Sequence, residues 1–409
     1  MKQTAPKSFR MHIGLFGRRN VGKSSLLNAL TKQSVSIVSE QAGTTTDPVE
    51  KPMEMLPLGP VLFIDTAGLD DEGDVGALRI QKSQRVFDRT DLGIIVTDGQ
   101  WGQYEETILS TLRNKETPVI VAFNKSDLAS APEEMLSMLR KEGVAYAVLS
   151  AATGEGVDDF RAALAKNAPD AFIENPTILG DLVPSGELAI FVVPIDKEAP
   201  KGRLIMPQVQ SIRDLLDSDA MALVVKEREL CAALQKLKDK PKLIVTDSQA
   251  FLKVAADTPD DIPLTSFSIL FARLKGDLVA QTQGARAIDK LKAGDRILIA
   301  EACTHRQLCE DIGRVKIPRW LTQFVGGKLE VDVTQGYDFP DDLSPYSLVI
   351  HCGACMWNRR TMQSRIEQCH RAGVPITNYG LAIAHSLGIL NRALEPFPAA
   401  KEAYHREVS

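Results

Sequence analysis

Gly17-Arg-Arg-Asn-Val-Gly22-Lys23-Ser24 is the stretch that decides the fold of the first part of this 409-residue chain. It has the spacing of a phosphate-binding loop, follows an apolar segment typical of a strand (His12–Phe16) and opens a helical pattern (Lys23–Leu30). Glycines in such a loop let backbone N–H groups surround phosphate oxygens, and the helix N-terminus adds partial positive charge. We expect Lys23 to contact the β- and γ-phosphates and Ser24 to bind Mg²⁺. The predicted nucleotide-binding residues of this loop are Gly17, Asn20, Val21, Gly22, Lys23, Ser24 and Ser25.

Three further motifs, each at the end of an expected strand, identify the nucleotide. In Asp65-Thr-Ala-Gly68, the carboxylate would hold the Mg²⁺ shell and the Gly68 N–H would meet the γ-phosphate. In Asn124-Lys125-Ser-Asp127, a carboxylate accepts hydrogen bonds from the ring N–H and the exocyclic amine of guanine, a pair of donors that adenine lacks. Ser150-Ala151-Ala152 would support the base through its main chain. These motifs predict a GTP or GDP site that includes Asp65, Gly68, Asn124, Lys125, Asp127, Ser150, Ala151 and Ala152.

Short apolar runs alternate with polar helical stretches along the chain, which predicts an α/β fold of parallel sheets covered by helices. Prolines near residues 169–184 and 259–263 mark two boundaries. We predict a P-loop GTPase domain at residues 1–172, followed by two smaller α/β domains with parallel sheets at 173–262 and 263–409. The expected strands are His12–Phe16, Val61–Asp65, Gly93–Asp98, Pro118–Asn124, Ala145–Ser150, Leu188–Pro194, Ala220–Val225, Leu243–Thr246, Arg296–Ala300 and Ser347–Ile350. Helical patterns in the last part cover Ile269–Lys292, Arg306–Gly313 and Arg359–Ala372.

The composition argues against several classes of protein. Hydrophobic residues make up 44% and charged residues 25%, which is typical of a folded rather than a disordered chain. The 48 Lys and Arg face 53 Asp and Glu, so a net charge of −5 does not indicate a nucleic-acid or anionic-membrane partner. No apolar run approaches the ~20 residues that span a bilayer, and the opening MKQTAPKSFR lacks an apolar signal segment, so we expect a cytoplasmic protein. Six cysteines are too few for a disulfide scaffold and are expected as thiols, metal ligands or redox groups.

Cysteine and histidine recur near the C-terminus in a pattern typical of a metal site. Cys303-Thr-His305 and His351-Cys352-Gly-Ala-Cys355 each follow an expected strand. The C-x-x-C spacing places two thiolates on one tight loop, where they reach one metal ion or two irons of one cluster. If the two strands are neighbours in one parallel sheet, Cys303 completes a three-thiolate site. The candidates for a fourth ligand are His305, His351 and Glu301, and the spacing leaves zinc and a [4Fe–4S] cluster both open.

The first domain resembles the translation-factor-class GTPases related to the tRNA-modification GTPase TrmE and the ribosome-assembly GTPase Era. Gly43-Thr-Thr45-Thr-Asp47 resembles switch I of that group, which places a second Mg²⁺ ligand at Thr45. Leu69 stands where Ras-like GTPases carry a water-orienting glutamine, so the water must be positioned otherwise. In this group an asparagine at the loop position of Asn20 helps to hold a K⁺ ion that acts as an arginine finger does. The resemblance therefore implies four catalytic residues, which are Lys23, Asn20, Thr45 and Gly68.

The combination of such a GTPase domain with C-x-H and H-C-x-x-C motifs resembles the HydF family along essentially the whole chain. This family comprises the GTPases and scaffolds of [FeFe]-hydrogenase maturation, and the stretch GTTTDPV at residues 43–49 also resembles it. The resemblance implies a [4Fe–4S] cluster on Cys303, Cys352 and Cys355 and a homodimer formed through the middle domain. It further implies that the protein receives a di-iron precursor, assembled with two radical-SAM maturases, and delivers it to apo-[FeFe]-hydrogenase.

Two other classes of protein remain open from the residues. An RNA-directed GTPase of tRNA modification or ribosome assembly, with a zinc-stabilised C-terminal domain, would share the GTPase motifs. The net charge and the lack of a GXXG loop outside the GTPase domain argue against it. A redox-sensing GTPase would instead change its activity with the oxidation state of its cluster or thiols.

Overall fold

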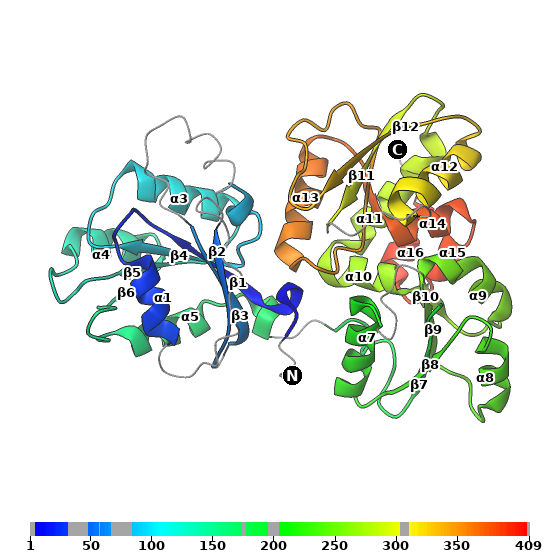
Figure 1. The fold of residues 1–409 in the computed structure, drawn as a ribbon, viewed down its shortest axis with the longest axis horizontal. Coiled ribbons are helices and arrows are strands. Elements are labelled where there is room, and N and C mark those ends of the chain that lie inside the picture. Colours follow the sequence, from blue (N-terminus) through cyan, green and yellow to red (C-terminus); the bar gives the residue numbers. More distant parts are fainter. Residues whose placement is uncertain are drawn as a thin grey trace. The chain divides into compact units, whose positions relative to one another are not determined.

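The structure is a computed structural model that describes residues 5–31, 48–56, 58–66, 84–173, 177–194, 204–302 and 311–406. Four predicted site residues, Thr45, Gly68, Cys303 and His305, lie outside the described residues. The described chain forms two compact units, Met1–Pro176 and Thr177–Ser409 (Figure 1).

The first unit is a six-stranded sheet with helices on both faces. The strand order is β2-β3-β1-β4-β5-β6; β2 pairs antiparallel with β3 and the other described pairs are parallel. Helices α1 and α5 cover one face and α3 and α4 the other, so β1 and β4 are buried along their whole length (Figure 1). Its elements are η1 (Lys7–Phe9), β1 (Met11–Phe16), α1 (Lys23–Thr31), β2 (Val49–Met55), β3 (Gly59–Asp65), β4 (Leu92–Thr97), α3 (Gln103–Asn114), β5 (Val119–Phe123), α4 (Glu133–Lys141), β6 (Ala145–Val148), α5 (Val157–Lys166) and α6 (Asp170–Ile173).

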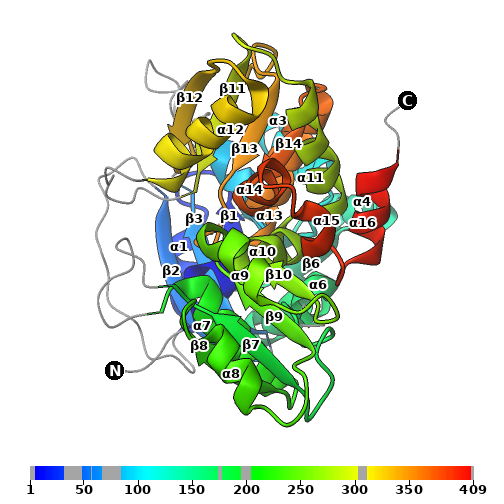
Figure 2. The ribbon, with the colours of Figure 1, turned by 90° about the vertical axis from the view of Figure 1, so that its right-hand side faces the viewer.

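The second unit contains two four-stranded parallel sheets. The middle sheet has the order β10-β9-β7-β8. Its elements and those that continue from it are β7 (Leu188–Val192), α7 (Met206–Asp217), β8 (Met221–Val225), α8 (Leu230–Lys236), β9 (Leu243–Thr246), η2 (Ser248–Ala250), α9 (Phe251–Asp257), β10 (Leu264–Ser266) and α10 (Phe267–Lys275). Helix α10 follows β10 directly and lies at the junction of the two sheets (Figure 1 and Figure 2).

The C-terminal sheet has the order β12-β11-β13-β14. Helices α12 and α14 pack on one face and α13 on the other. Its elements are α11 (Leu278–Ala285), η3 (Arg286–Lys290), β11 (Arg296–Glu301), the π-helical turn η4 (Ile312–Lys316), α12 (Ile317–Val325), β12 (Glu330–Gln335), β13 (Leu348–His351), α13 (Arg359–Arg371), β14 (Ile376–Asn378), α14 (Tyr379–Ser386), α15 (Leu390–Ala393) and α16 (Pro398–His405). Strands β11 and β13 are neighbours, with Ala300 opposite His351, which confirms the neighbouring strands on which the three-thiolate prediction depends.

The α/β prediction is confirmed, and each expected strand is present with its ends shifted by a residue or two. The expected helix Ile269–Lys292 is wrong as one element: α10 ends at Lys275 with Gly276 as its C-cap, Asp277 caps a second helix through the Ala280 N–H, and a 3₁₀ turn follows. The middle sheet includes β10 and so extends past residue 262, where we expected a boundary. In the part of the chain described, no helix is long and apolar enough to cross a membrane.

Candidate functional site

The phosphate-binding loop joins β1 to α1 and depends on two glycines in the left-handed region. Gly17 has φ 144°, and a Cβ there would lie 2.3 Å from the Val96 carbonyl oxygen. Gly22 has φ 95°, and a Cβ there would lie 2.2 Å from Asn124 Nδ2. A side chain at either position would collide with these atoms, so the loop can take this path only with glycine. Asn20 lies exposed on the same loop with φ 64°, a conformation that asparagine tolerates better than most residues.

Lys23, the first residue of α1, closes the loop that precedes it. Its ammonium donates to the carbonyl oxygens of Gly17 at 2.7 Å and Arg18 at 2.8 Å, and the residue is 9% exposed. Arg18 in turn forms a bidentate ion pair with Glu105, a buried carboxylate on α3. No local pattern predicts this last pair, because 87 residues separate the partners.

A hydroxyl and a carboxylate meet beside the loop. Ser24 Oγ donates to Asp65 Oδ2 at 3.1 Å, at the end of β3. The other oxygen, Asp65 Oδ1, is buried without a hydrogen-bond partner. Burial raises the pKa of Asp65, while Ser24 and Lys23 act in the opposite direction. An unpartnered buried carboxylate oxygen next to a serine hydroxyl fits an oxygen-preferring cation such as Mg²⁺.

Asn124 connects the phosphate loop to the predicted base-binding segment. Its Nδ2 donates to the Val21 carbonyl oxygen at 2.9 Å, and its Oδ1 accepts from the Ala151 N–H at 2.9 Å. Ser150 Oγ donates to Asp127 Oδ1 at 2.5 Å, which fixes an otherwise exposed carboxylate. The structure therefore brings the loop, Asn124, Asp127 and Ser150-Ala151 to one edge of the sheet.

At the C-terminal sheet, Cys352 follows β13 and lies against the end of β11. Its N–H donates to the Ala300 carbonyl oxygen at 2.9 Å, and the Ala302 N–H points at Cys352 Sγ at 3.1 Å. An N–H donor at sulfur stabilises the thiolate form that ligates metals. Cys303 comes directly after Ala302 in the sequence but lies outside the described residues. The structure thus brings the two strand ends together without showing the third thiol.

The second cysteine stands on a strained loop. In Cys352-Gly-Ala-Cys355 the residue in the left-handed region is Ala354, with φ 49°, rather than the glycine. Burial raises the pKa of Cys355, and the neighbouring Cys352 adds to the shift. A left-handed alanine is costly, so contacts of the surrounding residues must hold this loop.

His351 is held by hydrogen bonds at both ring nitrogens. Arg365 can only donate, so its contact of 2.9 Å requires Nε2 of His351 to accept, and Nδ1 then donates to the Cys352 carbonyl oxygen at 2.7 Å. Burial, with a smaller effect from Arg365, lowers the pKa of His351 to about 3. In this arrangement neither nitrogen faces a metal, which argues against His351 as the fourth ligand.

Glu301 is better placed than His351. It is 1% exposed, its Oε2 accepts from Arg314 and from Gln335 at 3.0 Å, and its Oε1 is buried without a partner. The hydroxyl of Tyr379 is likewise buried without a hydrogen-bond partner, and burial, with smaller effects from Cys352 and Glu301, raises the pKa of Tyr379 well above its usual value. Glu301 Oε1 and the Tyr379 hydroxyl are therefore two buried oxygens with no hydrogen-bond partner among the described residues.

The described residues do not complete a metal centre. Among them, no group of three His, Cys, Asp or Glu side chains lies close enough to hold a metal ion. The prediction of a cluster on Cys303, Cys352 and Cys355 therefore stays a prediction.

Lys275 is the residue of this region that sequence reasoning missed. It ends α10, it is 3% exposed, and its ammonium donates to the carbonyl oxygens of Ala354 at 3.3 Å, Cys355 at 3.2 Å and Trp357. Burial lowers the pKa of Lys275 to about 7, while the two cysteines act to raise it. A lysine at the end of a helix is usually expected to be exposed to solvent, and no local sequence pattern distinguishes Lys275 from such a residue.

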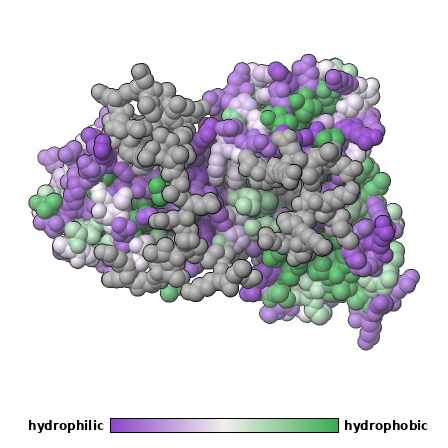
Figure 3. All heavy atoms as spheres, in the orientation of Figure 1, coloured by the Kyte–Doolittle hydropathy of each residue, from purple (hydrophilic) through white to green (hydrophobic). Residues whose placement is uncertain are grey.

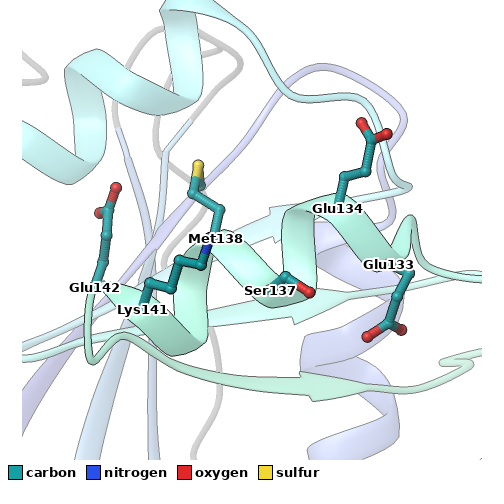
Figure 4. Close-up of a pocket in the computed structure, with 6 residues that line it drawn as sticks. All are labelled: Glu133, Glu134, Ser137, Met138, Lys141 and Glu142. Atoms are coloured by element: carbon teal, nitrogen blue, oxygen red, sulfur yellow. The ribbon is translucent and has the colours of Figure 1, made fainter.

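A surface hollow elsewhere in the first unit has a different character. It is lined along α4 by Glu133, Glu134, Ser137, Met138, Lys141 and Glu142. Figure 4 shows Glu133 and Glu134 pointing to opposite sides of the helix, so these side chains do not converge on a common ligand. We assign it no chemistry.

Three family models match the chain. One described as the 50S ribosome-binding GTPase matches residues 12–125, one described as the hydrogen maturase F dimerization domain matches 178–276, and one described as the hydrogen maturase F tetramerization domain matches 279–396. The last two together span more than half of the chain.

Curated relatives and solved structures are similar to parts of this chain. The tRNA modification GTPase MnmE of Chromobacterium violaceum is 38% identical over 166 residues, covering 40% of this chain and 36% of the relative. MnmE of Synechococcus sp. is 37% identical over 156 residues, covering 37% and 32%. The chain thus spans about a third of the length of these relatives. The G domain of the T. maritima FeoB iron transporter is 24% identical with a TM-score of 0.31, covering 39% of this chain and 98% of that one. Aquifex aeolicus Era is 16% identical with a TM-score of 0.32, covering 80% and 92%.

The P-loop, the two strand-end motifs and the doubly covered sheet define the class of protein: a P-loop GTPase with further α/β domains attached. Within this class, the matches beyond residue 176 are specific to one family. The chain belongs to the hydrogen maturase F (HydF) family.

Proposed function

We propose that this protein is a GTP-hydrolysing [4Fe–4S] scaffold or carrier that assembles or delivers the di-iron precursor of the [FeFe]-hydrogenase active site. The proposed partners are apo-[FeFe]-hydrogenase and two radical-SAM maturases, in the cytoplasm. The proposal is supported above all by the C-x-x-C loop, which lies against the end of β11. The chain also belongs to this family, and Asn124, Asp127, Ser150 and Ala151 lie together as a guanine site requires.

The proposed roles in GTP hydrolysis follow from the first unit. When nucleotide binds, the Lys23 ammonium exchanges its two carbonyl acceptors for oxygens of the β- and γ-phosphates. The N–H groups of the loop donate to the same phosphate oxygens. Asp127 selects guanine, and Ser150 fixes its carboxylate by a hydrogen bond. Asn124 joins the phosphate-binding loop to the Ser150-Ala151 segment. Mg²⁺ held at Ser24, Thr45 and the shell of Asp65 would neutralise phosphate charge. Asn20, exposed and left-handed, is the proposed K⁺ ligand, and Gly68 the proposed γ-phosphate contact.

The proposed cluster site uses Cys303, Cys352 and Cys355. The Ala302 N–H stabilises sulfur charge at Cys352, and Glu301 Oε1 is the described oxygen that best suits a weak, exchangeable fourth position. A bound [4Fe–4S] group would supply an iron with an open coordination site on which a precursor can dock. His305 stays a candidate for the fourth ligand.

The proposed assembly is a dimer through the middle domain. The printed descriptions of the matching families name dimerization and tetramerization. Strand β8 is an edge of the middle sheet, and hydrophobic side chains are exposed on it and on the neighbouring helix α7: Met221, Val224, Val209 and Leu216. Figure 3 shows hydrophobic residues gathered over this lower part of the second unit. An unpaired edge strand beside an apolar surface favours pairing with a second copy.

Metal analysis tests the scaffold proposal. Anaerobically purified and reconstituted protein should hold about four irons and four sulfides per chain and give a reduced-cluster EPR signal. One tightly held zinc per chain and no cluster would contradict the proposal and favour an RNA-directed GTPase with a structural zinc site. A salt-dependent RNA affinity would then confirm that alternative.

A second experiment tests whether nucleotide state controls partner contact. We propose that hydrolysis changes the switch segments and thereby the affinity for maturases and hydrogenase. Pull-down of the purified partners with GTP-analogue and GDP forms measures this. Equal binding in both states would contradict the gating role and leave the scaffold role standing.

A further inference from the structure

Lys275 is a buried lysine at the end of α10. Removing an ammonium from water costs several kcal/mol unless charge or hydrogen bonds replace the lost hydration. Its three described acceptors are neutral carbonyl oxygens, and all three belong to the segment that carries Cys355: Ala354, Cys355 and Trp357. These three hydrogen bonds connect the ammonium to one loop.

The loop needs such a contact. Ala354 is left-handed, and the ammonium binds its carbonyl oxygen. On the other side, Trp357 lies under the guanidinium of Arg365, with Cζ 4.3 Å from the ring centroid, and is stacked on Tyr337. Trp357 is thereby fixed from both sides, and the loop between Cys352 and Trp357 is held at its far end.

The position of Lys275 in the fold adds a second consequence. Helix α10 follows the last strand of the middle sheet and packs against α7 on one side and against α13 and α14 on the other. Near its start, Ser268 Oγ accepts from the Gly380 N–H, and the Ser268 carbonyl oxygen accepts from Asn378. One helix therefore fixes both the C-x-x-C loop and the start of α14 from the side of the middle sheet.

We propose that Lys275 is a positioning residue for the iron–sulfur site, which holds the C-x-x-C loop in its ligating conformation and places its ammonium next to that loop. This inference rests on the proposed cluster function. A cation close to an anionic cluster stabilises the more negative, reduced form, so the residue would raise the reduction potential as well as fix the loop.

The test uses the full-length protein, reconstituted anaerobically, as wild type, Lys275→Met, Lys275→Gln and Lys328→Met. Methionine has a similar length without charge or donors, glutamine keeps a donor without charge, and Lys328 is an exposed lysine of the same sheet region that serves as the matched control. Iron retention during a chelator challenge measures positioning, and EPR-monitored redox titration measures the effect of charge.

Lys275→Met should lose iron at least about fivefold faster than wild type, and Lys275→Gln should be intermediate because an amide NH₂ group remains as a hydrogen-bond donor. Both should show a reduction potential shifted to more negative values, and Lys328→Met should match wild type in both measurements. Unchanged retention and unchanged potential in both Lys275 variants would overturn the inference. The cluster-free variants must also be compared with the cluster-free wild type. If the variants fail to fold, while the wild type folds and gains no stability from the cluster, Lys275 is a structural core residue and the inference is overturned. A wild type that binds no cluster would instead refute the scaffold proposal.

Discussion

Two buried lysines, Lys23 and Lys275, make the same kind of contact in the two units of this protein. Each donates to carbonyl oxygens of a loop that carries a predicted site: Gly17 and Arg18 for Lys23, and Ala354, Cys355 and Trp357 for Lys275. Lys23 lies 5 to 6 residues from its acceptors, whereas Lys275 lies 79 to 82 residues away. A contact between residues close in the sequence can be recognised from a motif. A contact between residues far apart in the sequence leaves no such motif.

The strongest prediction separates the two sites. Replacing Cys303, Cys352 or Cys355 with Ala should abolish the cluster, because two thiolates do not retain a [4Fe–4S] group, and should leave GTP turnover within about twofold of wild type. Iron and sulfide content and phosphate release measure the two effects. Cys231→Ala, at an exposed and distant thiol, is the control that should keep four irons. Loss of GTP binding in the cluster variants would show that the sites are not separable.

The converse prediction concerns Lys23. Lys23→Ala should lower GTP turnover by about 100-fold to 1,000-fold, because a preorganised positive charge on the phosphates is lost, while the iron content stays unchanged. Phosphate release at saturating GTP measures the change. Lys141→Ala, an exposed lysine at the end of α4, should behave as wild type. A fall in iron content in Lys23→Ala would contradict the independence of the two sites.

A smaller effect is expected from the residue that supports His351 and Trp357. Arg365→Gln should lower the free energy of unfolding by about 3 kcal/mol, because it leaves buried acceptors unpartnered at His351 and at the Gly336 carbonyl and empties the space between two aromatic rings. Urea unfolding measures this value. Arg371→Gln on the same helix, where the side chain is exposed, should change it by less than about 0.5 kcal/mol. Equal effects of the two substitutions would show that the ring-stacked guanidinium has no special role.

The smallest expected effect is a pH dependence of the free energy of unfolding of the first unit. Burial, then the charge of Arg89, lowers the pKa of His12 in β1 to about 3, against 6.5 in the unfolded chain. The unfolded state therefore binds the proton more tightly, so stability is complete above about pH 6.5 and falls as the pH drops toward 3. Between pH 7.5 and pH 5 the first unit should lose about 2 kcal/mol.

Proteolysis in a urea series at both pH values, with fragments of the first unit quantified by mass spectrometry, measures this loss. His12→Leu should remove most of the pH dependence, and His370→Leu, at an exposed site in the second unit, should leave it in place. A slope that persists in His12→Leu would assign the effect to other groups.

The difference between local and long-range features also explains which strands could be predicted from the sequence. The four strands that were missed, β2, β10, β12 and β14, are each at the edge of a sheet. β2 and β12 are half-exposed and polar, and β10 and β14 have three residues each, so none shows the long apolar run of a strand covered on both faces. The inner strands β1, β4 and β7 have that run, which is why the fold class was predictable.

The sequence by itself determined the GTPase class and where its site is expected, because the glycines, Lys23, Ser24, Asp65, Asn124 and Asp127 stand in short motifs at strand ends. It also indicated the cysteines, whose spacing within one loop is a local property. Only the tertiary structure decided how each is supported: Arg365 occupies His351, Glu301 and Tyr379 present unpartnered oxygens, and Lys275 holds the C-x-x-C loop. Chemistry that needs groups within a few ångströms on one loop is written in the sequence, whereas contacts between distant segments depend on strand order and helix packing, which local patterns do not record.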